Sequence, residues 1–397
     1  MPNRAFHCLD GTPLRRPETA LGGGARVVWN DGLLDAYLGW ARQTGFRDYA
    51  VRIAGRLHVV AVERESVRAV LNDQADFQRN IAPTKHLFGA GMLRLTGEAW
   101  RVRRVMTTPP FRREGLGSAQ PIVVDEVDRL LDRWRARGGE PFRPSRDLSR
   151  CMASILGRYL FGFELGAQDR PALHESLIAL SVDSVLRHLL PRPAAILLNR
   201  WAVHRARRVL DALCGEILDR GGKTVFLEAL RAAMAAGQLD RRTAIDEIRT
   251  FLIAGHETSA TALSWMIAVL AERPEIQEDL RQESCGVDLR GGAPTDLLVR
   301  TTAVIRESLR LYPAVPISVS VAVRDARLGG YLIPKGTRVD VASYVVHRCP
   351  QRFEDPERFD PLRFTEGVPG TDEFLPFLGG PHLCLGRGLA MIELRAA

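Results

Sequence analysis

Residues 374–390 read FLPFLGGPHLCLGRGLA and place one cysteine, Cys384, in a run of phenylalanine, proline and glycine near the end of the chain. A buried structural cysteine usually lies inside an apolar segment of regular periodicity. Cys384 instead follows a Gly-Gly pair and Pro381 and precedes Gly386, and these residue types interrupt helices and strands. Such a loop brings the backbone close to a partner. Three interpretations are open: a metal or cofactor ligand, a nucleophilic thiolate, or a tight turn with an inert cysteine.

The composition is that of an enzyme-sized globular protein. The chain has 397 residues, of which 46% are hydrophobic and 26% charged, so it can bury a large core. The net charge of +8 comes from arginine, because Lys85, Lys223 and Lys335 are the only lysines. No basic run alternates with aromatic residues, so no nucleic-acid partner is predicted. The six cysteines lack CxxC spacing, which argues against a zinc site or a disulfide framework and fits a reducing cytoplasm.

Neither a signal peptide nor a membrane anchor is predicted. The N-terminal stretch MPNRAFHCLDGTPLRRPETALGGG has no apolar core of signal-peptide length. Residues 248–270, IRTFLIAGHETSATALSWMIAVL, are apolar enough to raise the question of a membrane span, but His256 and Glu257 at the centre would be costly in lipid. The segment therefore predicts a buried central helix, and we expect a cytoplasmic protein.

Periodicity predicts a mainly α fold with small β-sheets, in the α+β class. Residues 48–62 alternate in short β-branched runs about Gly55 and predict a hairpin. A polar stretch, 74–95, reads as irregular. From about 97 to 312 most of the chain has helical periodicity, broken at GGEPFRP, FELGAQDRP, LLPRPAA and DRGGK. Residues 315–342 return to strands with a turn at Gly329-Gly330.

We expect a single domain over residues 1–397, because no repeat and no step in composition divides the chain. A coil punctuated by proline, HRCPQRFEDPERFDPLRF, leads from the last strands into the cysteine loop at 377–386. The β-rich and helical parts would then be subregions of one body.

The motif AGHETS, residues 254–259, puts an acid and a hydroxyl into the middle of the apolar segment. Ala254 and Gly255 leave room on one face of the helix, while Glu257 and Thr258 are costly in an apolar interior. One interpretation is that Thr258 bonds back to its own helix and Glu257 finds an arginine partner. The other is a proton relay beside a reactive centre.

Two pairs at helical spacing carry weaker signals. Glu307 and Arg310 lie three residues apart, which alone indicates an ordinary salt bridge. The pair gains weight if Arg363 joins it in a partly buried network that pins a coil against a helix. Trp100 and Arg104 lie four residues apart, where an indole N–H and a guanidinium can hold an anionic group or form a cation–π pair.

Taken in chain order, these motifs resemble the cytochrome P450 family of haem-thiolate oxygenases, and the resemblance extends over most of the chain. The motifs that carry it are Trp100-x-x-x-Arg104, Ala254-Gly255-x-Glu257-Thr258, Glu307-x-x-Arg310, the proline-rich coil, and Phe377-x-x-Gly380-x-x-x-Cys384-x-Gly386. The resemblance implies the cytochrome P450 fold, a triangular helical body around a buried haem.

The resemblance also implies how the cofactor, haem b (iron protoporphyrin IX), is held. Cys384 would be the axial thiolate ligand of the iron and would donate electron density that favours O–O cleavage. Phe377 would pack near the sulfur, and Gly380 and Gly386 would let the backbone approach. The haem propionates would be held by Trp100, Arg104 and His382.

Further roles follow for the remaining motifs. The helix segment at Ala254 and Gly255 would lie on the distal side of the haem. There Thr258 would steady bound oxygen, and Glu257 with Thr258 would deliver protons. A structural network would keep the cysteine loop in place without touching substrate; its members are Glu307, Arg310 and Arg363.

The activity implied by the resemblance is that of a bacterial monooxygenase. It would insert one oxygen atom from O2 into a lipophilic or natural-product substrate, with two electrons from NAD(P)H through a separate ferredoxin or flavodoxin type donor and its reductase. The donor would dock on a basic proximal face; the alternative is that its arginines are ordinary solvated side chains. The residues are Arg101, Arg103, Arg112 and Arg113. The substrate pocket would be lined by residues 78–95, about 180–200 and Val315–Val319, with 184–201 as a lid or a packed helical corner.

Two departures from the family pattern stand out. Thirteen residues after Glu307, many relatives have an arginine that reaches a propionate, and this chain has Ser320. The chain also ends at Ala397, where the family usually continues the helix and adds a β hairpin, so we expect a partial sequence, and haem retention is in question. Two rival functions stay open. One is a peroxygenase of the same fold that uses hydrogen peroxide, although relatives of that kind tend to lose the acid–alcohol pair that is present here as Glu257 and Thr258. The other, favoured if the chain naturally ends at Ala397, is a non-catalytic haem-binding protein.

Overall fold

A computed structural model describes residues 32–53, 55–79, 84–165, 173, 175–176, 178–180, 183, 192–365 and 367–397, and the side chains of 192–200 lie outside that description. The described strands form a five-stranded sheet of order β1-β2-β7-β4-β3 and a separate hairpin, β5-β6. Their bounds are β1 (Tyr49–Ile53), β2 (Arg56–Ala61), β3 (Phe77–Arg79), β4 (Ser318–Ala322), β5 (Ala326–Leu328), β6 (Tyr331–Ile333) and β7 (Arg338–Val341).

The predicted hairpin at 48–62 is confirmed. Strands β1 and β2 pair antiparallel, with Ile53 opposite Arg56 and a left-handed Gly55, φ 76°, between them. The turn predicted at Gly329-Gly330 connects β5 to β6, and both glycines have positive φ. Because β2 also pairs parallel with β7, the early hairpin and the late strands form one sheet.

Strand β3 lies in the stretch that the sequence analysis interpreted as irregular. Phe77 is opposite Ala322 of β4, and Arg79 is opposite Ser320. A three-residue strand is too short to show alternation, so its formation depends on the partner strand and on the burial of Phe77, which is 3% exposed. The backbone N–H of Val323 also donates to the Asp76 carbonyl, at 2.9 Å.

Helices make up most of the rest of the described chain. The α-helices are α2 (Leu33–Gln43), α3 (Arg64–Asn72), α4 (Lys85–Phe88), α5 (Gly97–Thr107), α6 (Arg113–Leu116), α7 (Ala119–Arg135), α8 (Pro144–Phe161), α10 (Arg192–Arg220), α11 (Val225–Ala235), α12 (Arg241–Ala271), α13 (Pro274–Cys285), α14 (Val299–Leu311), α15 (Ser343–Val346) and α16 (Arg387–Ala396). Short 3-10 helices occupy η3 (Met92–Arg94), η4 (Pro109–Phe111), η5 (Thr295–Leu297), η6 (Pro361–Phe364) and η7 (Gly380–His382).

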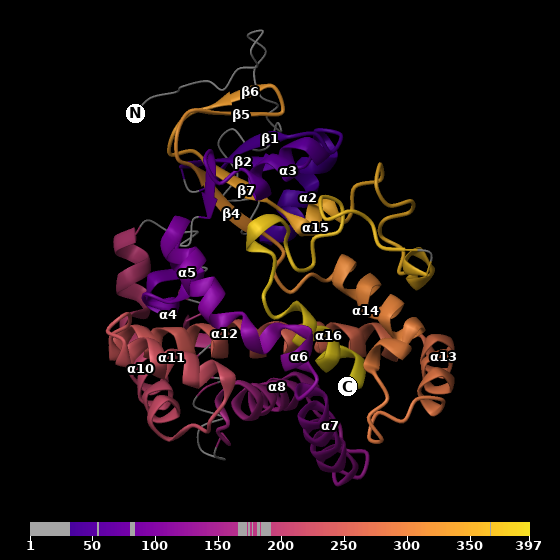
Figure 1. Cartoon of the computed structure of the whole chain (residues 1–397). Helices are drawn as coiled ribbons and strands as arrows, with labels where there is room; N and C mark the ends of the chain where they lie inside the picture. The colour runs from indigo at the N-terminus through magenta and orange to yellow at the C-terminus, as the bar shows by residue number, and fades with distance from the viewer. Residues whose placement is uncertain are drawn as a thin grey trace.

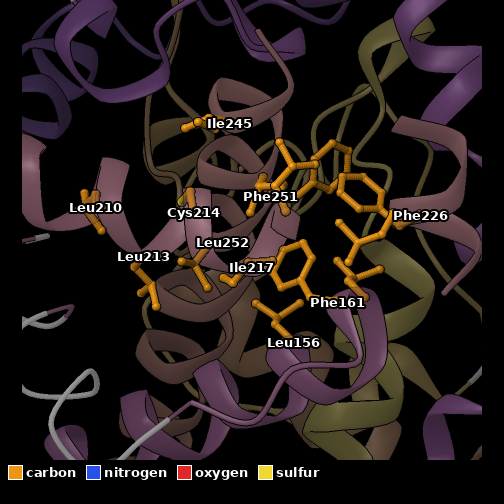
Figure 2. Close-up of a cluster of buried hydrophobic side chains, with 14 of the residues drawn as sticks. Leu156, Phe161, Leu210, Leu213, Cys214, Ile217, Phe226, Ile245, Phe251 and Leu252 are labelled. Carbon is orange, nitrogen blue, oxygen red and sulfur yellow. The ribbon is translucent and has the colours of Figure 1, made fainter. Parts of the chain in front are cut away.

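Helix α12 is the centre of the helical body. Its 31 residues span about 46 Å, and it begins where the Asp240 carboxylate accepts the backbone N–H of Thr243 at 2.7 Å. Side chains from α8, α10 and α11 pack on it, and Figure 2 labels ten members of this cluster, among them Leu156, Phe226 and Phe251. The buried central helix predicted for 248–270 is confirmed. In the described part of the chain, no helix is long and apolar enough to cross a membrane.

The cysteine loop lies between the sheet and the helical body. In Figure 1 the sheet, α2 and α3 occupy the upper part of the view, and the large helices occupy the lower part. The yellow C-terminal segment passes from the upper part to the lower part before α16. On the sheet side η7 packs on α3, and on the other side α16 packs on α7 and α12. The loop is therefore held by both subregions. The expected lid at 184–201 lies outside the described residues apart from the backbone of 192–200 and Trp201.

Candidate active site

Backbone hydrogen bonds and one obligatory glycine shape the cysteine loop. The N–H of Cys384 donates to the Phe377 carbonyl at 2.9 Å, and the N–H of Leu383 donates to the Gly380 carbonyl at 3.0 Å. Gly380 has φ 65°, and a Cβ there would collide with the carbonyl oxygen of Leu71 in α3. Only glycine fits this position, which fixes the loop against the sheet side of the molecule.

Opposing effects act on the pKa of the Cys384 thiol. Burial raises the pKa of the thiol above its usual value, while hydrogen bonds from the backbone N–H groups of Gly386 and Arg387 and the charges of Arg104 and Arg79 lower it. Cys384 is nevertheless exposed, so its sulfur is accessible to a partner. A cation bound to the sulfur would complete the stabilisation of a thiolate.

Four polar side chains gather beside the sulfur. The Arg104 guanidinium donates from Nη2 to the Leu383 carbonyl at 2.8 Å and lies 6.0 Å from the centre of the Trp100 ring. That ring in turn lies 4.2 Å from the ring of His382, centre to centre. His382 keeps a buried Nδ1 without a hydrogen-bond partner, and burial with the charges of Arg79 and Arg104 lowers its pKa to about 4.

Arg79 is the member of this group that sequence reasoning missed. Burial and the nearby Arg104 lower its pKa to about 10, and no described carboxylate lies within ion-pair distance of either arginine. Arg79 lines a small cavity together with Ser318, Ser320 and His382. The strand that carries Arg79 is so short that its sequence offers one signal only: Phe77 and Arg79 are two residues apart, the spacing of side chains on one face of a strand.

The distal motif occupies the middle of α12. Thr258 donates from Oγ1 to the Ala254 carbonyl at 2.8 Å, so the expected bond back to its own helix is present. Ala254 is exposed although its neighbour Leu252 is fully buried, which indicates open space beside the helix here. Gly255 faces α8 instead, where a Cβ would lie 2.8 Å from a methyl carbon of Leu156.

Glu257 has a different neighbour from the one expected. No arginine of the described residues pairs with it, and its closest ionic contact is His256, with Nε2 at 3.5 Å from Oε2. The Glu257 side chain is 45% exposed, yet its Oε2 is buried and without a hydrogen-bond partner. One oxygen of the carboxyl group is thus enclosed in the protein while the rest of the side chain is accessible.

The network around Glu307 and Arg310 is fully buried, and both side chains are 0% exposed. Arg310 donates to both Glu307 oxygens, at 2.7 and 2.8 Å, and to the carbonyls of His347 and Pro356. Arg363 donates to Glu307 at 3.3 Å and to the Glu354 carbonyl at 2.6 Å. The arrangement pins the proline-rich coil to α14, as the spacing and Arg363 together predict.

His347 extends this network to the cysteine loop and was missed by sequence reasoning. Its Nε2 accepts the N–H of Leu375 at 2.7 Å, so Nδ1 carries the hydrogen and donates to the Arg310 carbonyl at 3.0 Å. Burial lowers its pKa to about 3. A lone histidine in a coil gives no sequence signal for such a role.

A family comparison agrees with this geometry. The model of the family described as Cytochrome P450 matches residues 31–397. The chain belongs to the cytochrome P450 family. Its mainly helical structure with small sheets is the P450 fold that the sequence analysis expects, and membership makes the protein a haem-thiolate monooxygenase, whose cofactor is haem.

Similar P450 proteins come from distant organisms. The chain is 27% identical to a cytokinin hydroxylase of Arabidopsis thaliana over 91% of this chain and 76% of that protein. It is 30% identical to cytochrome P450 4A6 of Oryctolagus cuniculus, over 78% of this chain and 67% of the relative. It is also 30% identical to the putative cytochrome P450 137 of Mycobacterium tuberculosis (strain CDC 1551 / Oshkosh), over 79% and 66%.

The residues of this P450 fit a haem. A single cysteine in the loop suits a cofactor that brings further metal ligands of its own, as a haem does. Two partly buried guanidiniums without carboxylate partners among the described residues, and an orphaned Nδ1, suit a ligand that carries two carboxylates. Ser320 stands where many relatives have an arginine, and in this chain an arginine, Arg79, lies opposite it on the neighbouring strand β3.

One expectation about the donor-docking face is wrong. Arg103 does not lie on an exposed face, because its side chain is 13% exposed and donates to the buried Glu247 at 2.5 Å. Arg101, Arg112 and Arg113 are exposed. The helical period of α5 explains the difference, since Arg101 and Arg103 lie about 200° apart around its axis.

Proposed function

We propose that this P450 oxidises an apolar organic substrate with O2 and with electrons from a separate ferredoxin or flavodoxin type donor. The observation that carries the proposal is the pair Glu257 and Thr258 in the middle of α12, next to the exposed Ala254. When bound, the haem supplies oxygen activation and the insertion of one oxygen atom. Protons for that chemistry have to come from the protein.

The distal residues would divide this work. The Thr258 hydroxyl is held by the Ala254 carbonyl, so its oxygen lone pairs remain available to accept a proton or a hydrogen bond. Glu257, partly exposed and directly before Thr258, would take protons from solvent and pass them on. A peroxide-driven enzyme needs neither Glu257 nor Thr258, because hydrogen peroxide brings its own protons.

The propionates would be held by Arg79, Arg104, Trp100 and His382. Arg104 is already oriented by the Leu383 carbonyl, and the Trp100 and His382 rings pack together, so this side of the cavity is preorganised. The charge of Arg104 lowers the pKa of Arg79, and an anion bound between the two guanidiniums would offset that repulsion. Cys384 would bind the iron, Phe377 would pack near the sulfur, and Gly386 would supply an N–H to it.

Electron donation would use the exposed arginines beside the cysteine loop. Arg112 and Arg113 are exposed, and Arg113 lines an open cleft of about 880 Å³ together with Leu116, Arg387 and Met391. Arg387 follows the cysteine loop directly, so an acidic donor bound there would approach the sulfur side of the haem. The expected donor is a small acidic redox protein.

The substrate would approach from the edge of β4. Residues 315–319 lead into β4, and Val315 is 43% exposed. Ser318 and Ser320 of β4 line the cavity near Arg79. Valines at this edge favour a lipophilic substrate.

The test is a comparison of two oxidant systems on the haem-loaded full chain. Product formation with O2, NAD(P)H and a ferredoxin–reductase pair, and little product with hydrogen peroxide alone, would support the proposal. The reverse pattern would identify a peroxygenase. A protein that binds haem and turns over in neither system across a panel of lipophilic compounds would support a non-catalytic haem-binding role.

A further inference from the structure

The residue between the distal glycine and the distal acid, His256, makes specific contacts of its own. The ring is 1% exposed, on the side of α12 that packs on α8. Its Nδ1 lies 3.2 Å from the Leu252 carbonyl of the preceding turn, and its Nε2 lies 3.1 Å from Ser149 Oγ of α8. The same Nε2 is 3.5 Å from Glu257 Oε2. Both ring nitrogens are therefore engaged.

The partners fix which nitrogen carries a hydrogen. A carbonyl oxygen can only accept, so the contact with Leu252 requires the hydrogen on Nδ1. In a neutral ring Nε2 is then a lone pair, and Ser149 can donate to it. Glu257 Oε2 is buried and without a hydrogen-bond partner, so an ionised carboxylate would direct a second lone pair at the first. One proton on either Nε2 or Oε2 removes the repulsion between the two lone pairs and also gives the buried Oε2 a partner.

We propose that His256 is a positioning residue for the acid of this P450, and that His256 and Glu257 together hold one labile proton between Nε2 and Oε2. The inference rests on the proposed role of Glu257 in proton delivery. When the pair gives its shared proton to the distal site, His256 is left as a neutral ring and Glu257 as a carboxylate. Water at the accessible part of the Glu257 side chain, which is 45% exposed, then restores it. No redox change and no other reactant is required.

Other acidic groups on or against α12 have partners of their own, and His256 is the ionic contact of the Glu257 carboxyl among the described residues. Glu393 of α16 accepts from Ser259 at 2.6 Å. Farther along the helix, Glu247 pairs with Arg103 and Asp246 with Arg249, and from α14 Glu307 pairs with Arg310.

A merely structural role for His256 would be to tie α12 to α8 through Ser149. His256→Gln separates the two roles, because a glutamine amide can reach the position of Nε2 and keep a hydrogen bond to Ser149 but holds no labile proton. Ser264→Ala is the matched control. Ser264 lies on α12 as well, and its hydroxyl donates to the Ala260 carbonyl at 2.7 Å.

The experiment is infrared difference spectroscopy on the haem-loaded full chain, with the Glu257 carboxyl band assigned by its loss in Glu257→Gln. If the two groups share a proton, the frequency of this band changes in His256→Gln, because the C=O stretch of a carboxyl group depends on whether its proton is shared with a neighbour. It stays in place in Ser264→Ala. An unmoved band in His256→Gln overturns the inference.

A second readout separates this inference from the proposed function. We expect His256→Gln to release a larger share of its electrons as hydrogen peroxide while its thiolate-type carbon monoxide spectrum is unchanged. Peroxide release equal to that of the wild type would count against proton sharing. Loss of the thiolate spectrum in the wild type itself would instead contradict the proposed function.

Discussion

Arg79 of β3 lies directly opposite Ser320 of β4 in the antiparallel register of the sheet. Opposite residues of such a pair have Cβ atoms about 4.5–5.5 Å apart, so an arginine on either strand can reach the same space. Position 320 is where many P450 relatives have the arginine for a propionate. In this chain the guanidinium comes from the neighbouring strand, beside His382. Under the proposed function, the chain would keep the positive charge for a propionate and supply it from the neighbouring strand.

This relationship predicts a rescue. Arg79→Leu should speed the transfer of haem to an excess of an apo-haem acceptor by about tenfold, the effect of one hydrogen bond to a charged group. Adding Ser320→Arg to that variant should restore slow transfer. The exposed Arg101 provides the control, since Arg101→Leu should leave the rate unchanged. Equal rates for wild type and Arg79→Leu would remove Arg79 from the propionate site.

The distal pair predicts a change in the fate of electrons. Thr258→Ala and Glu257→Gln should lower product formation by about a hundredfold, the usual contribution of a positioned acid or base, while NAD(P)H consumption continues and hydrogen peroxide accumulates. Ser264→Ala on the same helix serves as the control. Full coupling in both distal variants would show that protons reach the site by another route.

The buried network predicts a large loss of stability. Arg310→Met removes the bidentate partner of the buried Glu307 carboxylate and leaves it only the longer ionic contact with Arg363, at 3.3 Å, so it should cost about 3–5 kcal/mol of unfolding free energy. Glu278 and Arg281 have the same three-residue spacing but are 48% and 65% exposed. Arg281→Met should therefore change stability little or not at all. Urea denaturation of the two variants side by side measures the difference, and similar midpoints would contradict this account.

The carboxyl of Glu393 predicts a pH dependence. Burial raises its pKa from 4.5 to about 8, against one hydrogen bond from Ser259. The folded chain thus holds a proton that the unfolded chain releases above pH 4.5, so this contribution to stability falls as pH rises from about 4.5 to 8. The slope approaches about 1.4 kcal/mol per pH unit. Glu393→Gln should lose less stability between pH 6 and pH 8 than the wild type, and the exposed Glu98→Gln should not differ from it. Parallel curves for all three proteins would contradict the assignment.

The exposed arginines predict how the electron donor docks. The double variant Arg112→Glu, Arg113→Glu should raise the apparent KM for an acidic ferredoxin and weaken the salt dependence of reduction. Arg327→Glu, at an exposed position of β5, should do neither. Unchanged salt dependence in the double variant would place the docking surface elsewhere.

The sequence reveals the parts of the site that short motifs encode and hides those that only tertiary pairing creates. Cys384, Trp100 and Arg104 stand at spacings that local helix and loop geometry explains, so they could be found from the chain alone. Arg79 could not, because its strand has three residues and exists through β4. His347 joins two segments far apart in the chain, which no local pattern reports.

The position of a charged residue on its helix also decides whether its side chain pairs inside the protein or is solvated. Arg103 reads like its neighbours on α5, yet the helix turns it inward to Glu247. Glu257 lies in an apolar segment, where an arginine partner was one of two interpretations, and its ionic contact among the described residues is His256. Neither outcome follows from composition, because both depend on which side of a helix meets a neighbouring element.

The reduced carbon monoxide difference spectrum of the haem-loaded chain tests the central claim most directly. The account predicts a Soret band at the position typical of thiolate-ligated haem in the wild type. It predicts loss of that band in Cys384→Ala, with Cys349→Ala, which removes a buried cysteine outside the loop, retaining it. A wild-type chain that takes up no haem, or a thiolate band that survives Cys384→Ala, would contradict it.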